Sequence, residues 1–397
     1  MKDHTFTQKR KKICVITGTR ADYGLLYPLL TKLAEDDQFD LKIAATGMHL
    51  SPEFGLTYKE IKKDGFNIDV KIENLLSSDT NVGISKSISL GISGFADYFE
   101  ATKPDMIVVL GDRYETFAAC VAAMTARIPI AHLHGGETTE GMIDEAIRHS
   151  ITKMSFLHFT STEEYRKRVI QLGENPERVF NVGAIGIENI NKMQLLSKED
   201  LEKDINFKLD KPYILVTFHP VTLENNTAQT QFSELLKALN EYKEEFKIIF
   251  TKANADTDGR IINSMIDEYV ARDPVRSIAF TSMGQIKYLS AMKYTLAVVG
   301  NSSSGIIEAP SFNIPTINIG DRQKGRIQAK SVINCDPYHK NISKAIKTVQ
   351  SETFRANIRN IINPYGNGNV SEKIVLHLKD YFKSEKINIK KSFFDLN

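Results

Sequence analysis

The sequence predicts an α/β fold made of two Rossmann-like, doubly wound halves that face each other across a cleft. Short apolar runs rich in β-branched residues alternate with stretches of amphipathic helical periodicity. Both faces of the apolar runs are hydrophobic, which is typical of parallel strands covered by helices. The alternation pauses at a charged, helix-prone connection over 191–211 and then restarts. The 397 residues are ample for two hydrophobic cores.

The first half is predicted to span residues 1–190. Its strands are runs of Val, Ile, Leu and Ala, and its helices repeat apolar residues every three or four positions. Strands are expected at 12–17, 41–46, 106–110, 129–132, 158–160 and 179–181. Helices are expected at 24–35, 84–102, 114–127, 143–154 and 162–172.

The second half is predicted to span residues 191–369, and its first strand follows Pro212, which ends the charged connection. Strands are expected at 213–218, 247–251, 277–280, 296–300 and 316–319. Helices are expected at 230–242, 258–270 and 283–291, with a further one starting over 305–309. A final helix over 370–382 follows a turn-rich Gly/Asn segment, and its own pattern does not show which half it packs on.

Composition excludes several classes of function. A net charge of +2 gives no reason to expect nucleic acid or an anionic membrane as a partner. No apolar run approaches the ~20 residues of a membrane helix, and the first 12 residues lack the apolar core of a signal peptide. The cysteines Cys14, Cys120 and Cys335 cannot all pair, and the first two lie in apolar runs. We therefore expect a cytoplasmic protein with buried thiols.

The most informative segment runs from Ile128 to His149, and it begins with a short apolar run that is predicted to be a strand. It holds His132, His134 and Glu137 around a Gly-Gly turn. Acids and imidazoles at the carboxyl end of such a strand suggest proton transfer. His132 and His134, two apart on a strand, are expected to face one side. A zinc site is the alternative, disfavoured because the cysteines lack ligand spacing.

The helix that follows this turn carries two pairs of charged residues. Asp144 and Arg148 are four residues apart and share a face, while Glu145 and His149 share the adjacent face. Surface ion pairs worth only ~0.3–0.5 kcal/mol each are the alternative interpretation. Their position just after Glu137 favours a functional site.

Three other strand ends carry candidate residues. Arg20 follows the first strand in a tight turn and is suited to hold a phosphate, although the turn lacks the Gly-x-Gly-x-x-Gly pattern of dinucleotide binding. Asp112 and Arg113 emerge together after a Gly, where Asp112 is equally suited to cap the next helix. His219 precedes a Pro and is held extended at the cleft edge, with a core histidine as the alternative.

A hydroxyl-rich turn lies at the end of another strand of the second half. It contains three consecutive serines between two glycines, and Ser302 and Ser303 are the first two of them. Such a turn is suited to bind a diphosphate. Glu308 lies about one turn further on, within reach of ribose hydroxyls. The next strand end adds cations at Arg322 and Arg326, for which a basic surface loop is the alternative.

Taken together, these motifs resemble one family along nearly the whole chain. The motifs are Thr-Gly-Thr-Arg20-Ala-Asp-Tyr, Thr46-Gly-Met-His49, Gly-Asp112-Arg-Tyr-Glu, His-Leu-His134-Gly-Gly-Glu137, Asp144-Glu-Ala-Ile-Arg148-His149, Phe-His219-Pro, Gly-Asn-Ser302-Ser-Ser-Gly-Ile-Ile-Glu308 and Asp-Arg322-Gln-Lys-Gly-Arg326. Each motif is weak alone, but their joint order resembles the hydrolysing UDP-N-acetylglucosamine 2-epimerases of bacterial sialic-acid synthesis.

The resemblance implies a glycosyltransferase-B-like fold in which the C-terminal helix, about 370–397, joins the first half. It implies conversion of UDP-N-acetylglucosamine to N-acetylmannosamine and UDP, by anti elimination to 2-acetamidoglucal and syn addition of water. It implies no metal and no cofactor, and a homodimer or homotetramer.

The resemblance also implies the roles of individual residues. As catalytic residues it implies Asp112, Glu137, Asp144, His219, Arg148 and His134. As contacts to the UDP-sugar it implies Arg20, His49, Arg113, Asn254, Ser302, Ser303, Gly305, Glu308 and Arg322. Some relatives have Glu-Gly-Gly-Glu where this chain has His134-Gly-Gly-Glu137, so either Glu137 or His134 takes the role of that acid.

Four alternatives remain open at the level of sequence. The same chemistry on UDP-2,4-diacetamido-2,4,6-trideoxyglucose is the nearest one. A non-hydrolysing epimerase is disfavoured, because its relatives tend to have Pro-Glu-Glu-x-Asn-Arg where this chain has Ile143-Asp-Glu-Ala-Ile-Arg148. A glycosyltransferase would leave C2 unchanged, and a nucleotide-sugar sensor would not need all three carboxylates.

Overall fold

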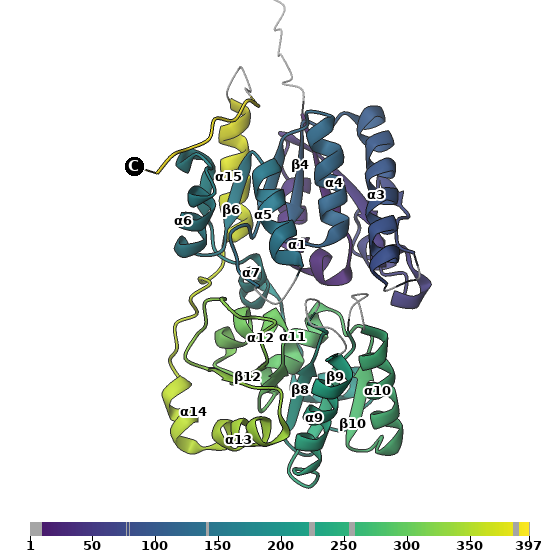
Figure 1. Ribbon diagram of the computed structural model, residues 1–397, viewed down its shortest axis with the longest axis vertical. Helices are drawn as coiled ribbons and strands as arrows, with labels where there is room; N and C mark the ends of the chain where they lie inside the picture. The colour runs from purple at the N-terminus through teal and green to yellow at the C-terminus, as the bar shows by residue number, and fades with distance from the viewer. Residues whose placement is uncertain are drawn as a thin grey trace, which may run out of the picture.

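The computed structural model describes residues 10–76, 78, 80–139, 143–221, 227–253, 259–383 and 389–396. Figure 1 shows two α/β halves stacked along the long axis of the molecule. The predicted fold class is confirmed, because each half is a parallel sheet covered by helices.

The sheet of the first half has seven parallel strands in the order β3-β2-β1-β4-β5-β6-β7. The order runs outward in both directions from the β1–β4 pair, which is the switch point where open α/β sheets place ligands. The strands are β1 (Lys11–Thr17), β2 (Phe39–Thr46), β3 (Val70–Ile72), β4 (Met106–Leu110), β5 (Ile130–Leu133), β6 (Leu157–Thr160) and β7 (Val179–Asn181).

The helices of the first half cover both faces of this sheet. They are α1 (Arg20–Ala34), α2 (Tyr58–Lys63), α3 (Asn81–Thr102), α4 (Tyr114–Thr125), α5 (Asp144–Met154), α6 (Glu163–Gln171) and α7 (Ile185–Lys192). Strand β4 is buried at all of its positions because helices pack on each side of it.

The sheet of the second half has six parallel strands in the order β10-β9-β8-β11-β12-β13. The strands are β8 (Tyr213–Thr217), β9 (Lys247–Thr251), β10 (Ser277–Phe280), β11 (Val298–Gly300), β12 (Thr316–Ile319) and β13 (Val332–Cys335). Its helices are α8 (Lys198–Asp204), α9 (Ala228–Asn240), α10 (Gly259–Arg272), α11 (Gln285–Tyr294), α12 (Ser303–Ile307), α13 (His339–Gln350) and α14 (Glu352–Ile358).

The last helix, α15 (Val370–Lys383), returns to the first half, where Figure 1 shows it in yellow. Its apolar residues Val370, Ile374 and Leu378 are buried in the core that β1 and α1 share. Its own periodicity did not reveal this packing, because an apolar stripe fits either sheet equally well.

Helix α1 begins at Arg20, four residues before the predicted start at 24. Thr19 and Asp22 form a capping box: the Thr19 hydroxyl accepts from the backbone N–H of Asp22, and the Asp22 carboxylate accepts from the backbone N–H of Thr19. The early start places the side chains of Arg20 and Asp22 at the edge of the sheet, beside the cleft.

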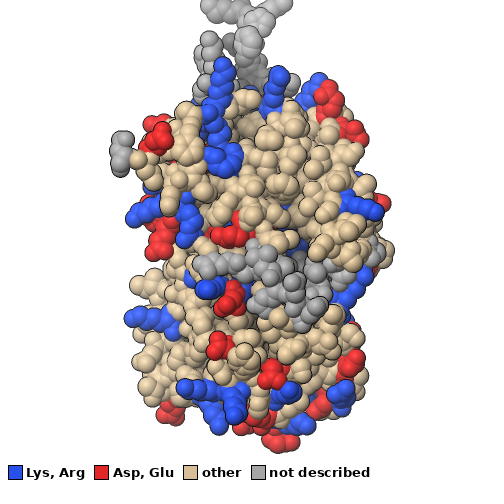
Figure 2. All heavy atoms as spheres, in the orientation of Figure 1, with Lys and Arg blue, Asp and Glu red and all other residues tan. Residues whose placement is uncertain are grey.

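None of the helices in the described ranges is both long and apolar enough to cross a membrane. Figure 2 shows basic and acidic side chains interspersed over the visible face of the molecule.

Candidate active site

A cavity of about 400 Å³ lies between the two halves. The carboxyl ends of strands from both sheets border it, as expected for an open α/β sheet. Its wall contains most of the predicted site residues, namely Arg20, Asp112, Arg113, His134, Glu137, Asp144, Arg148, His219, Ser302, Ser303, Glu308 and Arg322.

Asp112 reaches the cavity from a turn at the end of β4. The turn depends on Gly111, which has a φ of +74°, and the Gly111 N–H donates to the Leu133 carbonyl. His132 Nε2 lies 2.8 Å from the Gly111 carbonyl oxygen, so the imidazole supports the turn from behind. Burial lowers the pKa of His132 to about 3 and keeps this ring neutral.

The expectation that His132 and His134 face one side is wrong. Strand β5 ends at Leu133, and His134 adopts a φ of +65°, which turns its side chain away from the strand pattern. Of these two rings only His134 lines the cavity.

Arg148 is the central cation of the first half, and its side chain is only 1% exposed. Its guanidinium pairs with the Asp112 carboxylate and, at 2.7 Å, with Glu145 Oε2. It also donates at 2.7 Å to the Glu137 carbonyl oxygen and the Thr139 hydroxyl. The surface ion-pair interpretation of Arg148 is therefore wrong.

Glu137 has both carboxylate oxygens occupied. Oε1 accepts from the Ser161 hydroxyl at 2.7 Å and lies 3.1 Å from His134 Nδ1, while Oε2 lies 2.5 Å from Arg326 Nη1. Burial alone would raise the pKa of Glu137, but Arg326, His134 and Arg148 outweigh it and hold the pKa well below its usual range. The charged groups around Glu137 therefore favour its ionised form.

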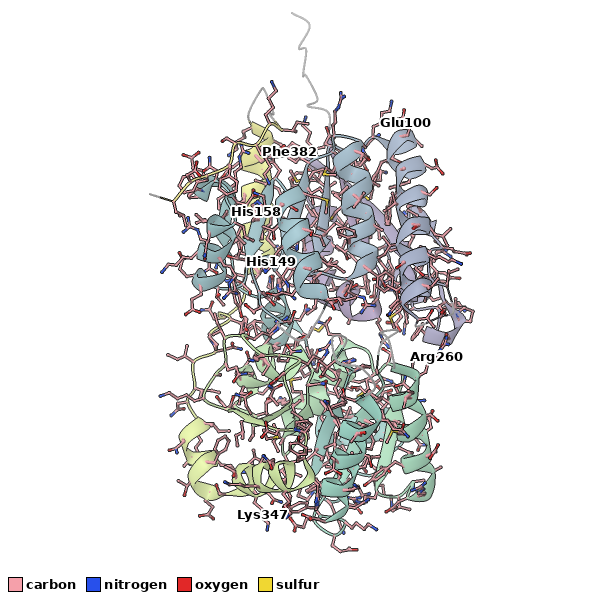
Figure 3. All side chains as sticks on the ribbon, viewed as in Figure 1. Glu100, His149, His158, Arg260, Lys347 and Phe382 are labelled. Atoms are coloured by element: carbon pink, nitrogen blue, oxygen red, sulfur yellow. The ribbon has the colours of Figure 1, made fainter. Side chains whose placement is uncertain are left out.

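Glu145 and His149 share a face of α5, as predicted, with 3.1 Å between Glu145 Oε1 and His149 Nε2. Burial raises the pKa of Glu145, and the contacts with His149, the Thr139 N–H and Arg148 lower it, to a net value of about 2. Figure 3 labels His149, which lies in the middle of α5.

Arg20 links the two halves across the cavity. Its Nε lies 2.6 Å from Glu60 Oε2, and its Nη1 donates at 2.7 Å to the Ser282 hydroxyl of the second half. Arg113 nearby pairs with Glu115 at 3.3 Å. Asp22 lines the same cavity, and burial, opposed by Arg113, raises its pKa to about 6.

The hydroxyl-rich turn of the second half carries a further set of contacts. Ser302 Oγ lies 3.1 Å from Ser304 Oγ, and Tyr288 bonds to the Ser304 hydroxyl. Arg322 Nη1 donates at 3.1 Å to the Asn301 carbonyl, beside the cavity. This cluster of hydroxyl groups and a cation is suited to the oxygens of a diphosphate.

His219 is held at the end of β8 by Asn301. The His219 N–H donates to Asn301 Oδ1 at 2.7 Å, and Asn301 Nδ2 donates to the His219 carbonyl at 2.8 Å. This reciprocal pair fixes the backbone of His219, whose side chain lines the cavity.

Gly300 ends β11 and orients the hydroxyl-rich turn. Its φ is +133°, and a Cβ placed there would lie 1.9 Å from the Thr217 carbonyl oxygen. We expect Gly300→Ala to lower the free energy of unfolding by about 3 kcal/mol or more, because strain adds to the clash. Gly55→Ala is the matched control: φ is also positive there, but nothing lies within 4 Å, so strain alone should cost about 1 kcal/mol. Equal losses in urea denaturation would contradict this prediction.

Glu308 is 8% exposed, and burial raises its pKa to about 8 from the ordinary 4.5. The stability that protonated Glu308 contributes is fully present below pH 4.5 and is lost as the pH rises through about 8. We therefore expect Glu308→Gln to remove a fall in unfolding free energy on the order of a few kcal/mol between pH 5 and pH 9. Urea denaturation at both pH values measures it, and an unchanged pH dependence would contradict it.

Two predicted contacts, His49 and Gly305, are not found in the cavity wall, and a third is not described. The ring of His49 is fully buried, with Nε2 2.9 Å from the Thr17 hydroxyl and Nδ1 2.8 Å from the Thr57 hydroxyl, so its predicted substrate contact is corrected to a structural role. Gly305 instead allows α12 to approach β12, since a Cβ there would lie 2.7 Å from Thr316 Cγ2. Asn254 lies outside the described residues.

Sequence reasoning did not place Asp22, Tyr288 or Arg326 among the site residues, although all three line the cavity. Asp22 was missed because helix α1 was expected to start at residue 24. Arg326 was noticed only as one of several loop cations, because its partner Glu137 lies 189 residues away in sequence. Among the described residues, no group of three or more His, Cys, Asp and Glu side chains is arranged to hold a metal ion.

Comparisons with known proteins show which family and fold this chain resembles. Residues 31–379 match the sequence model of a family described as UDP-N-acetylglucosamine 2-epimerase. The chain is 47% identical over 348 residues, covering 88% of this chain and 90% of the relative, to a GDP/UDP-N,N'-diacetylbacillosamine 2-epimerase (hydrolyzing) from Campylobacter jejuni. It is 42% identical over 387 residues, covering 97% and 98%, to the polysialic acid biosynthesis protein P7 of Escherichia coli.

A crystal structure of the Neisseria meningitidis UDP-GlcNAc 2-epimerase bound to UDP-GlcNAc has the same fold. Its TM-score is 0.78 at 20% identity, with 93% of this chain and 100% of the other covered.

Proposed function

This chain belongs to the UDP-N-acetylglucosamine 2-epimerase family, and from that membership we propose that it converts UDP-N-acetylglucosamine and water to N-acetylmannosamine and UDP. The observation that carries the proposal is the composition of the cavity. Carboxylates of the first half, Asp112 and Glu137, lie across it from the serine turn and Arg322 of the second half. Breaking a sugar–diphosphate bond and exchanging a carbon-bound proton needs both groups in one site.

In the elimination step, the C2–H bond and the C1–O bond of the sugar break and a C1=C2 double bond forms. The proton goes to a carboxylate, and UDP leaves with the electron pair of the C1–O bond. Asp112 is the proposed base, because its side chain is 22% exposed toward the cavity and keeps an acceptor position besides its pair with Arg148. Glu137 is a poorer base since Ser161, His134 and Arg326 occupy its oxygens.

In the hydration step, a donor side chain protonates C2 on the face that inverts its configuration, while water adds its hydroxyl group to C1 and returns its remaining proton to that side chain. The proton donor must differ from the base that acted on the first face. Asp144 lines the cavity and is the proposed donor, because Glu137 and the Ile185 N–H occupy the two ring nitrogens of His134.

The second half supplies the proposed nucleotide site. Ser302, Ser303 and Arg322 hold the diphosphate, and Glu308 binds the ribose hydroxyls. Arg20 approaches the same place from the first half, next to Ser282. His219 contacts the departing phosphate, because it follows the central strand β8 by two residues and lines the cavity beside this turn.

A second candidate substrate is UDP-2,4-diacetamido-2,4,6-trideoxyglucose, on which the same two steps would act. The specific observation that favours it is the 47% identity to a diacetylbacillosamine 2-epimerase. The relative named for polysialic acid biosynthesis, at 42% identity, favours the first substrate.

One experiment tests both candidates. Each UDP-sugar is incubated with the protein in D2O, and the products are followed by proton NMR. Free N-acetylmannosamine with deuterium at C2, together with UDP, is the expected result, and faster turnover of the diacetamido sugar would select the second candidate. A 2-epimerised sugar still linked to UDP would contradict hydrolysis. Turnover that requires an acceptor and leaves C2 unlabelled would indicate a transferase.

A further inference from the structure

Arg326 crosses from the second half into the first. It lies in the loop between β12 and β13, and its Nη1 lies 2.5 Å from Glu137 Oε2. Both side chains are nearly inaccessible, with 8% of Arg326 and 3% of Glu137 exposed. A buried, charge-assisted contact of this kind joins the two halves inside the cavity wall.

The backbone next to Arg326 is anchored to the first half as well. The Ile327 N–H donates at 3.0 Å to the hydroxyl of Tyr165 on α6. The hydroxyl of Tyr365 donates at 2.9 Å to the Ile327 carbonyl and lies 3.2 Å from that of Tyr165. The hydrogen bonds of Ile327 therefore hold the guanidinium of Arg326 next to Glu137.

A buried ion pair of this kind often adds less to stability than apolar packing of similar volume would add. Burying a guanidinium is unfavourable, and Arg326 Nε is buried with no hydrogen-bond partner among the described residues. Buried ionisable groups with shifted pKa values in the wall of a cavity are typical of functional sites.

The charged groups around Glu137 come from four elements. His134 lies at the end of β5, Arg148 on α5 and Arg326 on the loop after β12, with Tyr165 on α6 as a titratable neighbour. Asp112 and Tyr365 act on Arg326 itself. Among the groups that lower the pKa of Glu137, Arg326 has the largest effect. Removing Arg326 would therefore leave less to oppose the effect of burial, and the pKa of Glu137 would rise.

We propose that Arg326 is a positioning residue that keeps Glu137 ionised and correctly oriented, and that it does so only while the two halves are in contact. The inference rests on the proposed function, in which Glu137 belongs to the set of carboxylates around the reacting sugar. With this role for Arg326, the site in the first half is complete only when the second half supplies the Arg326 side chain.

A direct test measures the ionisation of Glu137 without turnover. The protein is labelled with ¹³C at glutamate side-chain carboxyl carbons, and the NMR signal that Glu137→Gln removes is that of Glu137. In the wild type this signal should not titrate around neutral pH. In Arg326→Gln its midpoint should move upward, and an unmoved midpoint would overturn the proposal.

A kinetic test follows kcat, KM and UDP affinity for Arg326→Gln and Arg326→Lys. We expect Arg326→Gln to lower kcat by about 100-fold with nearly unchanged UDP affinity, and to shift the acid limb of the kcat profile to higher pH. Arg326→Lys should retain more activity, and added guanidinium ion should partly restore Arg326→Gln. Lys324→Gln, in the same loop, is the control and should behave as the wild type.

The outcomes separate the two proposals. A wild type that releases no UDP from either UDP-sugar contradicts the proposed function, while the NMR titration still tests the role of Arg326. A wild-type pH profile in Arg326→Gln, or an activity loss that only follows a loss of UDP affinity, would overturn the role of Arg326 alone.

Discussion

Asp112→Asn is expected to lower turnover by about 1000-fold or more while UDP affinity stays within a few fold. An amide cannot accept the C2 proton, and it keeps the size of the side chain at the end of β4. The nucleotide contacts proposed for Ser302 and Arg322 lie on the other half and remain intact. Initial rates of UDP release and a calorimetric titration with UDP measure the two quantities.

The control for this variant is Glu100→Gln, which makes the same kind of change at a carboxylate with 83% exposure. Figure 3 shows Glu100 at the end of the first half that is far from the junction of the halves. Its turnover should equal that of the wild type. Turnover retained by Asp112→Asn would remove Asp112 from the catalytic set.

Arg148→Met is expected to lower the free energy of unfolding by about 3–5 kcal/mol, because it removes a buried cation from two partly buried carboxylates and from two further hydrogen-bond acceptors. Asp112 and Glu145 would lose their ion pair, and the Glu137 carbonyl and the Thr139 hydroxyl would lose a donor. Methionine keeps much of the apolar contact of the Arg stem, so the loss reports the charge. Urea denaturation followed by circular dichroism measures it.

Arg272→Met is the matched control, since Arg272 is 78% exposed and its pair with Glu268 spans 3.7 Å. It should change stability by no more than about 0.5 kcal/mol. In the double variant Asp112→Asn/Arg148→Met the effects should not add, because the two side chains form one pair. Additive effects, or a loss for Arg148→Met as small as that of the control, would contradict a buried network.

Sequence reasoning located the central strands accurately because each is buried on both faces. Strands β4, β9 and β12 have the predicted bounds, and so do the edge strands β7 and β10. Two of the four edge strands, β3 and β13, were not predicted. Their positions are partly exposed, and Lys71 and Asn334 interrupt the apolar pattern, so neither forms an apolar run.

For the site, the position of a residue in the sequence was enough to predict that it lines the cavity when the residue lies two positions after a strand. Asp112, His219 and Ser302 line the cavity for that reason. The same logic failed at His49, which follows β2 but enters a short helical turn that packs its ring between Thr17 and Thr57. Local pattern cannot show whether a ring points into a cleft or into the core.

The sequence alone determined that this protein has two parallel α/β halves with acids at the strand ends of one and hydroxyls and cations at those of the other. Hydrophobic periodicity and turn residues are local properties, so they can be inferred from neighbours along the chain. Only the tertiary structure decided that Arg148 is buried beneath Asp112 and that Arg326 reaches Glu137 from the other half. Those pairs depend on how two distant sheets pack, and the ionisation of each carboxyl depends on charges that packing alone brings together.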